Sequence, residues 1–297
     1  MARGAYPVCC GVLRAVVSAA LLWAASCPAP AQLPSAFLEE LTSYELRDAI
    51  DAGKTTLLVP IGGTEQNGPH MALGKHNARA RTLSGRIAAR LGNALVAPVL
   101  AYVPEGSIDP PTQHMRYPGT ITIPTDVFEK TLEAAARSFR HHGFTDIVLL
   151  GDHGGYQGSL RNVAAKLNGE WARAGPAGNA ARVHAIDAYY RVADGGFARL
   201  LRSEGFADAE IGEHAGLADT ALTMDTHPEL VRKDRLAPSE PAARSGVRGD
   251  PTRASAELGR KGTALIVDAT VEAVTQSIRA GRMARTSRIT TSGSTTK

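Results

Sequence analysis

The chain has 297 residues, of which 43% are hydrophobic, and this is enough to bury the core of one large domain. The formal net charge of +4 is spread along the sequence, which argues against nucleic-acid binding and indicates a solvated basic surface. All three cysteines (Cys9, Cys10 and Cys27) precede residue 32, which excludes disulfides, thiolate metal ligands and a cysteine nucleophile from the remaining chain.

Residues 1–31 have the pattern of a secretory signal peptide. Arginines precede an apolar run over 15–25, and small residues follow at Ala29-Pro30-Ala31. The apolar run is too short to span a bilayer comfortably. We therefore expect cleavage after Ala31, a secreted or periplasmic location, and no membrane attachment afterwards. Lipid attachment at Cys27 is a less favoured alternative, because the preceding Ala-Ala-Ser lacks the usual leucine.

Helical and strand patterns alternate over residues 32–285, which predicts a single α/β layered domain. Residues 286–297 are rich in Ser, Thr, Gly and Lys and are expected to form a disordered tail. In chain order, the patterns predict a helix over 43–50, a strand over 57–61, a helix over 77–91, a strand over 95–100, a loop over 104–120, a helix over 126–142, a strand over 146–150, a helix over 159–174, a strand over 183–187, and helices over 218–224 and 254–280.

Two glycine-rich loops follow the strands predicted over 57–61 and 146–150. The first loop contains Glu65 and His76, and the second contains His153. One carboxylate and two imidazoles at the ends of adjacent strands would form a three-ligand site for Zn²⁺ or a similar ion, with an open position for water. Each residue alone has an ordinary alternative, as a solvated loop acid or a hydrogen-bonded histidine, and it is their combination that suggests chemistry.

A third polar segment surrounds Glu213, His214 and Asp219, on a loop that enters a helix. His214 is a candidate catalytic residue that passes a proton to a departing nitrogen, and Asp219 is a candidate metal ligand or orienting group. A helix start with acidic capping residues is the alternative interpretation. The remaining candidates for substrate contact or outer support of the site are Asn67, His70, Glu105, Ser107, His114, Asp152, Gly154, Gly155 and Glu213.

Within this set, different roles are expected. His70 follows a proline and is expected to brace its loop. The segment 104–116, with Glu105, Ser107 and His114, is expected to line the pocket and set substrate choice. The backbone N–H groups of Gly154 and Gly155 are expected to stabilise an oxyanion.

Taken together, these segments resemble the creatininase (creatinine amidohydrolase) family. Residues 62–76 correspond to a family loop Gly-Ser-x-Glu-Gln-His-Gly-Pro-His-Leu-Pro-Leu-Gly-x-Asp. Residues 151–156 correspond to an Asn-Gly-His-Gly-Gly-Asn loop, and residues 214–221 to His-Ala-Gly-Glu-x-Glu-Thr-Ser. A Pro-Gly-Thr element within 117–122 and a late Gly-Asp-Pro element at 249–251 also match, so that the resemblance spans residues 37–282.

The resemblance implies a three-layer α/β/α sandwich around a mostly parallel sheet, assembled as a homo-oligomer that is often a hexamer. It also implies hydrolysis of a C–N bond in a cyclic or linear amide by a metal pair. Carried over by position, Glu65 matches a ligand of the first metal, His153 matches a metal-binding histidine, and His214 matches a histidine that takes part in proton transfer.

Several positions depart from the family pattern. Asn67 replaces the histidine of the second metal, and His76 replaces the aspartate that bridges both metals. Gly155 stands where creatininase proper has a glutamate, although other members also have glycine there. Leu217 and Asp219 replace the two glutamates of the third motif. A carboxylate can bridge two cations, whereas a neutral imidazole offers a metal only one lone pair, so these changes disfavour a metal pair.

We therefore expect one divalent ion per chain, held by Glu65, His76 and His153, with Asp219 as a possible fourth ligand. Zn²⁺ is favoured, with Mn or Fe as alternatives. The expected function is that of a metal-dependent amidohydrolase acting on a small cyclic or linear amide, although creatinine itself is not expected. A catalytically inactive protein that binds small molecules or metal is the main alternative. Hydrolysis of a lactone or formamide is another, because the metal-assisted step is the same.

Overall fold

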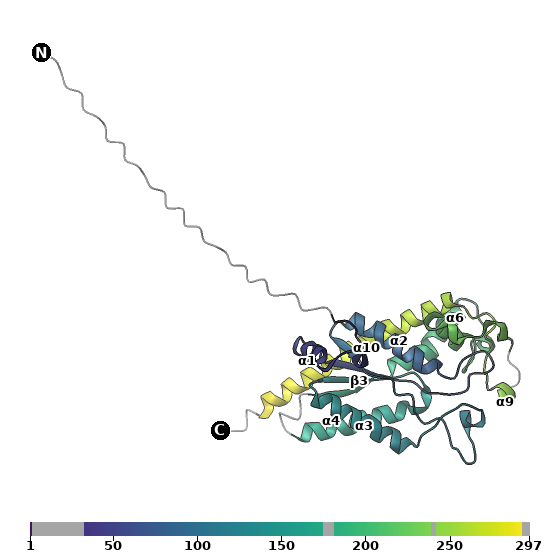
Figure 1. Ribbon diagram of the computed structural model, residues 1–297, viewed down its shortest axis with the longest axis horizontal. Helices are drawn as coiled ribbons and strands as arrows, with labels where there is room; N and C mark the ends of the chain where they lie inside the picture. Colours follow the sequence, from purple (N-terminus) through teal and green to yellow (C-terminus); the bar gives the residue numbers. More distant parts are fainter. Residues whose placement is uncertain (2–32, 175–180, 239–241, 293–297) are drawn as a thin grey trace. The chain divides into compact units, whose positions relative to one another are not determined.

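The computed structural model describes residue 1 and residues 33–174, 181–238 and 242–292 (Figure 1). Residues 2–31 of the expected signal peptide lie outside the described residues. The described residues from Leu33 onward form a single compact unit. Its centre is a parallel four-stranded sheet in the order β2 (Ala94–Val96), β1 (Thr56–Ile61), β3 (Asp146–Gly151) and β4 (Arg182–Ala185).

The central strands β1 and β3 are buried along their whole length, which is typical of parallel strands covered on both faces. Alternate side chains of each strand point to opposite faces. Leu58 and Val148 belong to one hydrophobic core, and Leu57 and Ile147 belong to the other. Because each face of the sheet has its own core, the sheet must be covered by helices on both sides.

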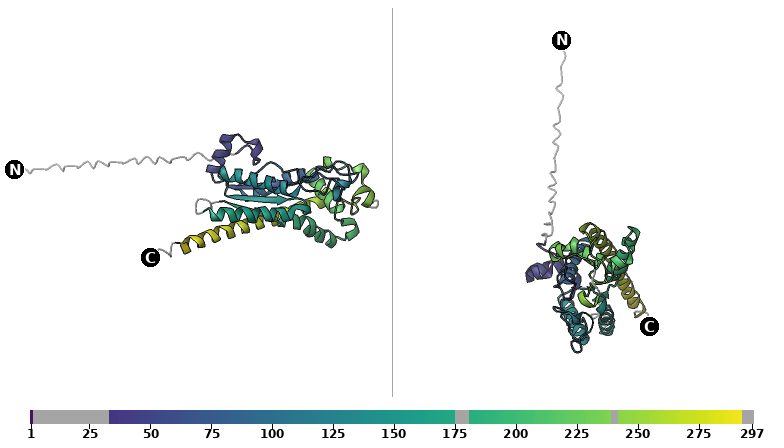
Figure 2. Two further views of the ribbon diagram at one scale, coloured as in Figure 1. Left: turned by 90° about the horizontal axis from the view of Figure 1, so that it is seen from below. Right: turned by 90° about the vertical axis from the view of Figure 1, so that its right-hand side faces the viewer.

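Helices cover both faces accordingly (Figure 2). The predicted three-layer α/β/α architecture around a parallel sheet is confirmed. One face packs against α1 (Ser43–Asp51), α3 (Thr125–His141) and α4 (Gln157–Arg173). The other packs against α2 (Lys75–Leu91), α5 (Ala188–Arg191), α6 (Phe197–Ser203), α7 (Asp208–Ile211), α8 (Leu217–Thr226) and α10 (Ala256–Ser292).

Short turns and one further helix complete the described elements. They are η1 (Leu38–Glu40), η2 (Gln113–Arg116), η3 (Gly154–Tyr156), η5 (Val192–Gly196), η6 (Pro228–Leu230), η7 (Lys233–Arg235) and α9 (Ala242–Ser245). Nowhere in the part of the chain that the structure describes is there a helix with the length and apolar character needed to cross a bilayer.

Three segments differ from the sequence expectations. The strand expected over 95–100 ends at Val96, because Pro98 cannot continue a hydrogen-bonded ladder. The segment 188–203 is helical, although the adjacent Gly195 and Gly196 weaken its helical pattern. α10 continues as far as Ser292, past the start of the tail expected from residue 286, and residues 293–297 lie outside the described residues.

Candidate active site

Sheet topology brings the two glycine-rich loops together. Glu65 follows β1 and His153 follows β3, and these neighbouring parallel strands pair as far as Ile61 and Gly151. The carboxyl ends of adjacent parallel strands meet at one edge of a sheet, which is where ligands bind in open α/β folds. The side chain of Asn77, in the first turns of α2, accepts a hydrogen bond of 2.9 Å from the N–H of Gly63 and so holds the start of the first loop.

Asn67 closes the loop that presents Glu65. Its side-chain amide donates to the carbonyl oxygens of Glu65 (2.9 Å) and Ala72 (3.0 Å), and the N–H of Glu65 donates to the carbonyl of Leu73 (3.2 Å). Asn67 is therefore a buried clamp on the backbone, at a position where the family pattern has a metal-binding histidine.

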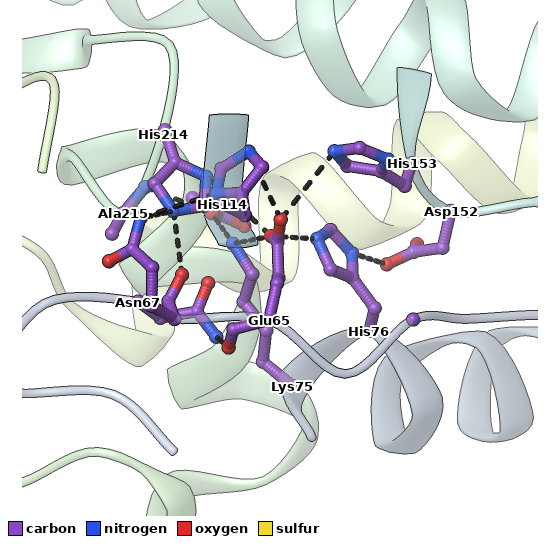
Figure 3. A network of polar contacts seen from close by, with 12 residues as sticks. Glu65, Asn67, Lys75, His76, His114, Asp152, His153, His214 and Ala215 are labelled. Atoms are coloured by element: carbon purple, nitrogen blue, oxygen red, sulfur yellow. Dashed lines mark hydrogen bonds and ion pairs between the residues drawn. The ribbon is translucent and has the colours of Figure 1, made fainter. Parts of the chain in front are cut away.

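His76 lies between two carboxylates (Figure 3). Its Nε2 is 2.7 Å from Oε1 of Glu65, and its Nδ1 is 2.6 Å from Oδ2 of Asp152. Burial and the charge of Lys75 act to lower the pKa of His76, but the two carboxylates outweigh them and raise it. Since both ring nitrogens are engaged, His76 in this arrangement has no lone pair directed at a metal.

Four other donors converge beside it. One donor atom from each of Glu65, Glu105, His114 and His153 lies within 4.8 Å of all the others. Nε2 of His114 is 3.3 Å and Nε2 of His153 is 3.6 Å from Oε2 of Glu65 (Figure 3). Nδ1 of His153 is 3.6 Å from Oε1 of Glu105. The structure thus brings His153 to Glu65 as expected. Glu105 and His114 complete this cluster of donors in place of His76, which contacts the other carboxylate oxygen of Glu65.

The chemistry of this cluster fits a divalent metal ion. Oε2 of Glu65 and both carboxylate oxygens of Glu105 are buried with no hydrogen-bond partner among the described residues. Burying unpaired carboxylates is costly, and a cation would satisfy them. Burial, aided by the charge of Glu65, raises the pKa of Glu105 to about 8. Burial lowers the pKa of His153 to about 4, which keeps its imidazole in the neutral form that metals bind.

Oxygen and imidazole donors in equal number suit Zn, Mn or Fe. On the structure's own donor set, the cluster of Glu65, Glu105, His114 and His153 is therefore a candidate site for a single ion.

The Pro-Gly-Thr element positions two of these donors. The hydroxyl of Thr122 accepts from the N–H of Glu105 at 2.9 Å. The hydroxyl of Thr120 donates to the carbonyl of His114 at 2.8 Å and accepts from the N–H of Gln66 at 3.1 Å. This segment thus connects the loop of Glu65 to the loop that carries Glu105 and His114.

His214 enters the site from the loop before α8. Its Nδ1 is 3.6 Å from Oε1 of Glu65, and its Nε2 lies 2.9 Å from the carbonyl of Gln66. Burial and the charge of Lys75 lower the pKa of His214 to about 3. Its backbone pairs with Arg248, directly before Gly249 of the late Gly-Asp-Pro element. Gly249 has φ +135°, and a side chain there would collide with the backbone of neighbouring glycines, so this element is required for close packing.

Lys75 and Arg79 are buried cations that the sequence interpretation did not single out. Lys75 is 1% exposed, lies 3.6 Å from Oε1 of Glu65 and contacts Asp219. Arg79 contacts Asp219 at 2.7 Å and Asp152 at 2.8 Å. A signal was present, because both residues fall on the helical stripe of α2 that continues through Leu83.

Lys75 and Arg79 line a cleft of about 860 Å³. Asp152, Gly154 and Glu213 line it, as do His76, His153 and His214. The N–H of Gly155, an expected oxyanion donor, donates to Nδ1 of His153 at 3.3 Å in this structure.

Ser107 and His70 are among the sequence candidates that do not line the cleft. Ser107 is exposed, and its hydroxyl bonds to the carbonyl of Asp109 within its own loop. His70 is buried, and its Nε2 lies 3.0 Å from the carbonyl of Ala215, a contact consistent with the bracing role expected of it.

The chain is similar to several known proteins. A family model described as creatininase, creatinine amidohydrolase, matches residues 39–274. Creatinine amidohydrolase of Pseudomonas putida is 28% identical over 260 residues, covering 82% of this chain and 96% of that protein. The mycofactocin precursor peptide peptidase of Mycolicibacterium smegmatis is 29% identical over 227 residues, covering 69% of this chain and 78% of that protein.

Solved structures of creatininase show the same fold. The crystal structure of a creatinine amidohydrolase matches with a TM-score of 0.69 at 26% identity, covering 82% of this chain and 98% of that one. Other matching structures are described as a manganese creatininase and as a zinc–zinc form of a creatininase mutant. Metal is thus named in two creatininase structures, and the names of the two sequence relatives refer to creatinine and to a precursor peptide.

Proposed function

This chain belongs to the creatininase family, and from that premise we propose that it is a metal-dependent amidohydrolase that cleaves a C–N bond in a small cyclic or linear amide. The observation that carries the proposal is the cluster of Glu65, Glu105, His114 and His153, in which Oε2 of Glu65 and both carboxylate oxygens of Glu105 are buried with no hydrogen-bond partner among the described residues. A cluster of this kind at the carboxyl edge of a parallel sheet, beside a cleft, is suited to bind one cation and a substrate together.

An ion bound by these four residues would supply Lewis acidity, polarising the substrate carbonyl and lowering the pKa of water. Residues of this chain would transfer the proton and stabilise the oxyanion. His214 lies at the same carboxylate, and its buried imidazole starts neutral, so Nδ1 would accept a proton and return it to the departing nitrogen. The backbone N–H of Gly154, which lines the cleft, is the candidate to stabilise the oxyanion.

The size of the cleft bears on the substrate. Its volume of about 860 Å³ lies in the upper part of the range typical of pockets for drug-sized ligands. A linear amide or short peptide would therefore fit as well as a compact ring. The similarity to a peptide peptidase supports the same choice, and we propose that linear amides are better substrates than creatinine.

The proposal is tested by metal analysis and by turnover of an amide panel. The protein is loaded with Mn²⁺ or Zn²⁺ and assayed on creatinine, other cyclic amides and short peptides. Glu65→Ala and His153→Ala are expected to lose both the bound ion and all turnover. His141→Ala is the matched control, because His141 is exposed at the end of α3 and should leave both readouts unchanged. Absence of turnover across the panel, with a ligand still detected by thermal shift, would instead support a binding protein.

We also propose that the protein acts outside the cytoplasm, as the leader-like pattern of residues 1–31 suggests. The intact mass of protein recovered from a bacterial periplasm is then expected to correspond to a chain beginning at Gln32. A mass that includes a diacylglyceryl group on Cys27 would support the lipoprotein alternative, and a full-length mass would refute both.

A further inference from the structure

Five buried side chains and the partly buried Asp219 form a closed ring beneath the four-donor cluster, in which acids and bases alternate. Glu65 contacts Lys75, Lys75 contacts Asp219, and Asp219 contacts Arg79. The ring then closes from Arg79 to Asp152, from Asp152 to His76, and from His76 back to Glu65. Figure 3 shows four of these side chains, Glu65, Lys75, His76 and Asp152, around the centre of the site.

Each acid of the ring has two basic partners, so the ring carries its own compensating charge. Lysine and arginine are almost never fully buried unless they are paired in this way. The two oxygens of Glu65 therefore have different surroundings. Oε1 faces the ring, with His76 at 2.7 Å and Lys75 at 3.6 Å, whereas Oε2 faces His114 and His153 and has no hydrogen-bond partner among the described residues.

The charge of Glu105 lies outside this ring. Both of its oxygens are buried without a hydrogen-bond partner in the described part of the chain. Among the described residues, the buried carboxylate oxygens that lack a partner in this site therefore lie on the side of Glu65 that faces Glu105. On the other side, fixed protein charge already occupies the space between Glu65 and Asp219.

We propose that Lys75 limits this site to one divalent ion. Its ammonium group contacts both Glu65 and Asp219, and it thereby lies where a second ion would otherwise bind. The inference deepens the proposed function and rests on it. Lys75 acts through Glu65 and is thus a positioning residue. Arg79 completes the ring and orients Asp219 from its other side.

The test counts bound ions instead of measuring activity. The full chain is stripped with a chelator and dialysed against Mn²⁺ alone, and metal per chain is determined by elemental analysis. Wild-type protein is expected to hold one ion. Lys75→Met and Lys75→Gln remove the charge and are expected to hold two ions. Lys75→Gln keeps a donor that can reach Asp219, so it serves where the methionine variant does not fold.

Two controls separate charge from structure. Lys75→Arg retains the cation and is expected to hold one ion. Lys75→Met combined with Asp219→Asn removes one charge of each sign and is also expected to hold one. A charge-removing variant that folds only when Mn²⁺ is present, and not in equivalent monovalent salt, supports the inference.

The inference is overturned if both charge-removing variants hold a single ion, if Lys75→Arg holds two, or if neither charge-removing variant folds at any Mn²⁺ concentration. Wild-type protein that holds two ions would also overturn it while leaving the amidohydrolase proposal intact. Wild-type protein that holds none would remove the metal-dependent function itself, so the two failures are distinguishable.

Discussion

Glu105 and Glu65 lie buried beside each other, and each places a carboxylate oxygen within 4.8 Å of the other donors of the cluster. Two carboxylates at such a site repel each other unless a cation or a proton lies between them. Burial, together with the charge of Glu65, raises the pKa of Glu105 to about 8. The pair therefore makes the metal-free protein sensitive to pH.

The first prediction concerns this sensitivity. Between pH 4.5, the ordinary pKa of a glutamate, and about 8, Glu105 of the folded metal-free protein holds a proton that the unfolded chain has lost. Its contribution to stability therefore declines as pH rises through this window. We expect Glu105→Gln to remove that decline, measured as the difference in thermal midpoint between variant and wild type across the window, with chelator present.

His153 and His214 act in the opposite direction, because burial lowers their pKa values to about 4 and about 3. Both histidines are present in the variant and in the wild type, so their effect cancels in the difference. A difference that stays constant from pH 4.5 to 8 would show that Glu105 is ionised in the metal-free protein, contrary to this prediction.

A second prediction separates His76 from the metal ligands. Because both ring nitrogens of His76 bond to carboxylates, His76→Ala is expected to weaken metal binding on the order of ten-fold, as loss of an outer-shell partner does. His114→Ala and His153→Ala are expected to weaken it much more. Competition with a chromophoric chelator gives the three dissociation constants under identical conditions.

The reverse order would restore the ligand set expected from the sequence. If His76→Ala abolished binding while His114→Ala left it unchanged, His76 would be the ligand and His114 a neighbour of the site.

The third prediction concerns Gly249, whose lack of a side chain allows its segment to pack closely against the loop that carries His214. A Cβ at this position would lie 2.8 Å from the Cα atoms of both Gly212 and Gly216, and its φ of +135° is unfavourable for any other residue. Gly249→Ala is expected to lower the free energy of unfolding by about 2 kcal/mol or more, measured by urea unfolding. Turnover should fall as well, because His214 is displaced.

Gly92→Ala is the matched control. Gly92 also has positive φ (+76°), but a Cβ there would meet nothing within 4 Å. That variant bears only the cost of the left-handed conformation, about 1 kcal/mol. Equal destabilisation by the two substitutions would show that the close packing around Gly249 contributes nothing.

The sequence predicted the architecture and the meeting of the two loops, because these depend on local patterns. Apolar runs bounded by glycine predicted β1 and β3, and alternation with helical patterns placed Glu65 and His153 at neighbouring strand ends. The alternating pattern was weaker where Gly195 and Gly196 interrupt it, and the helices there were missed.

The partners of the site residues were harder to predict, since they depend on contacts between distant segments. His76 was correctly brought to Glu65, but nothing in its spacing indicates that Asp152 engages its other nitrogen. Lys75 meets an acid 144 positions away along the chain, and only the folded arrangement shows that contact. Residue type suggests what a side chain offers to a metal, whereas its neighbours decide whether that lone pair is available.

The last prediction tests whether the hydroxyl of Thr120 positions His114. This hydroxyl donates to the carbonyl of His114 and accepts from the N–H of Gln66, so it joins the two loops that supply Glu65 and His114. Thr120→Val keeps the shape but leaves both backbone groups without this partner, which costs about 1–3 kcal/mol for a fully buried group and less for these part-buried ones. We expect lower stability together with weaker metal binding, whereas Thr120→Ser, which retains the hydroxyl, should restore the metal affinity. If Thr120→Val lost stability but bound Mn²⁺ as tightly as wild type, the threonine would support the fold without positioning the ligand.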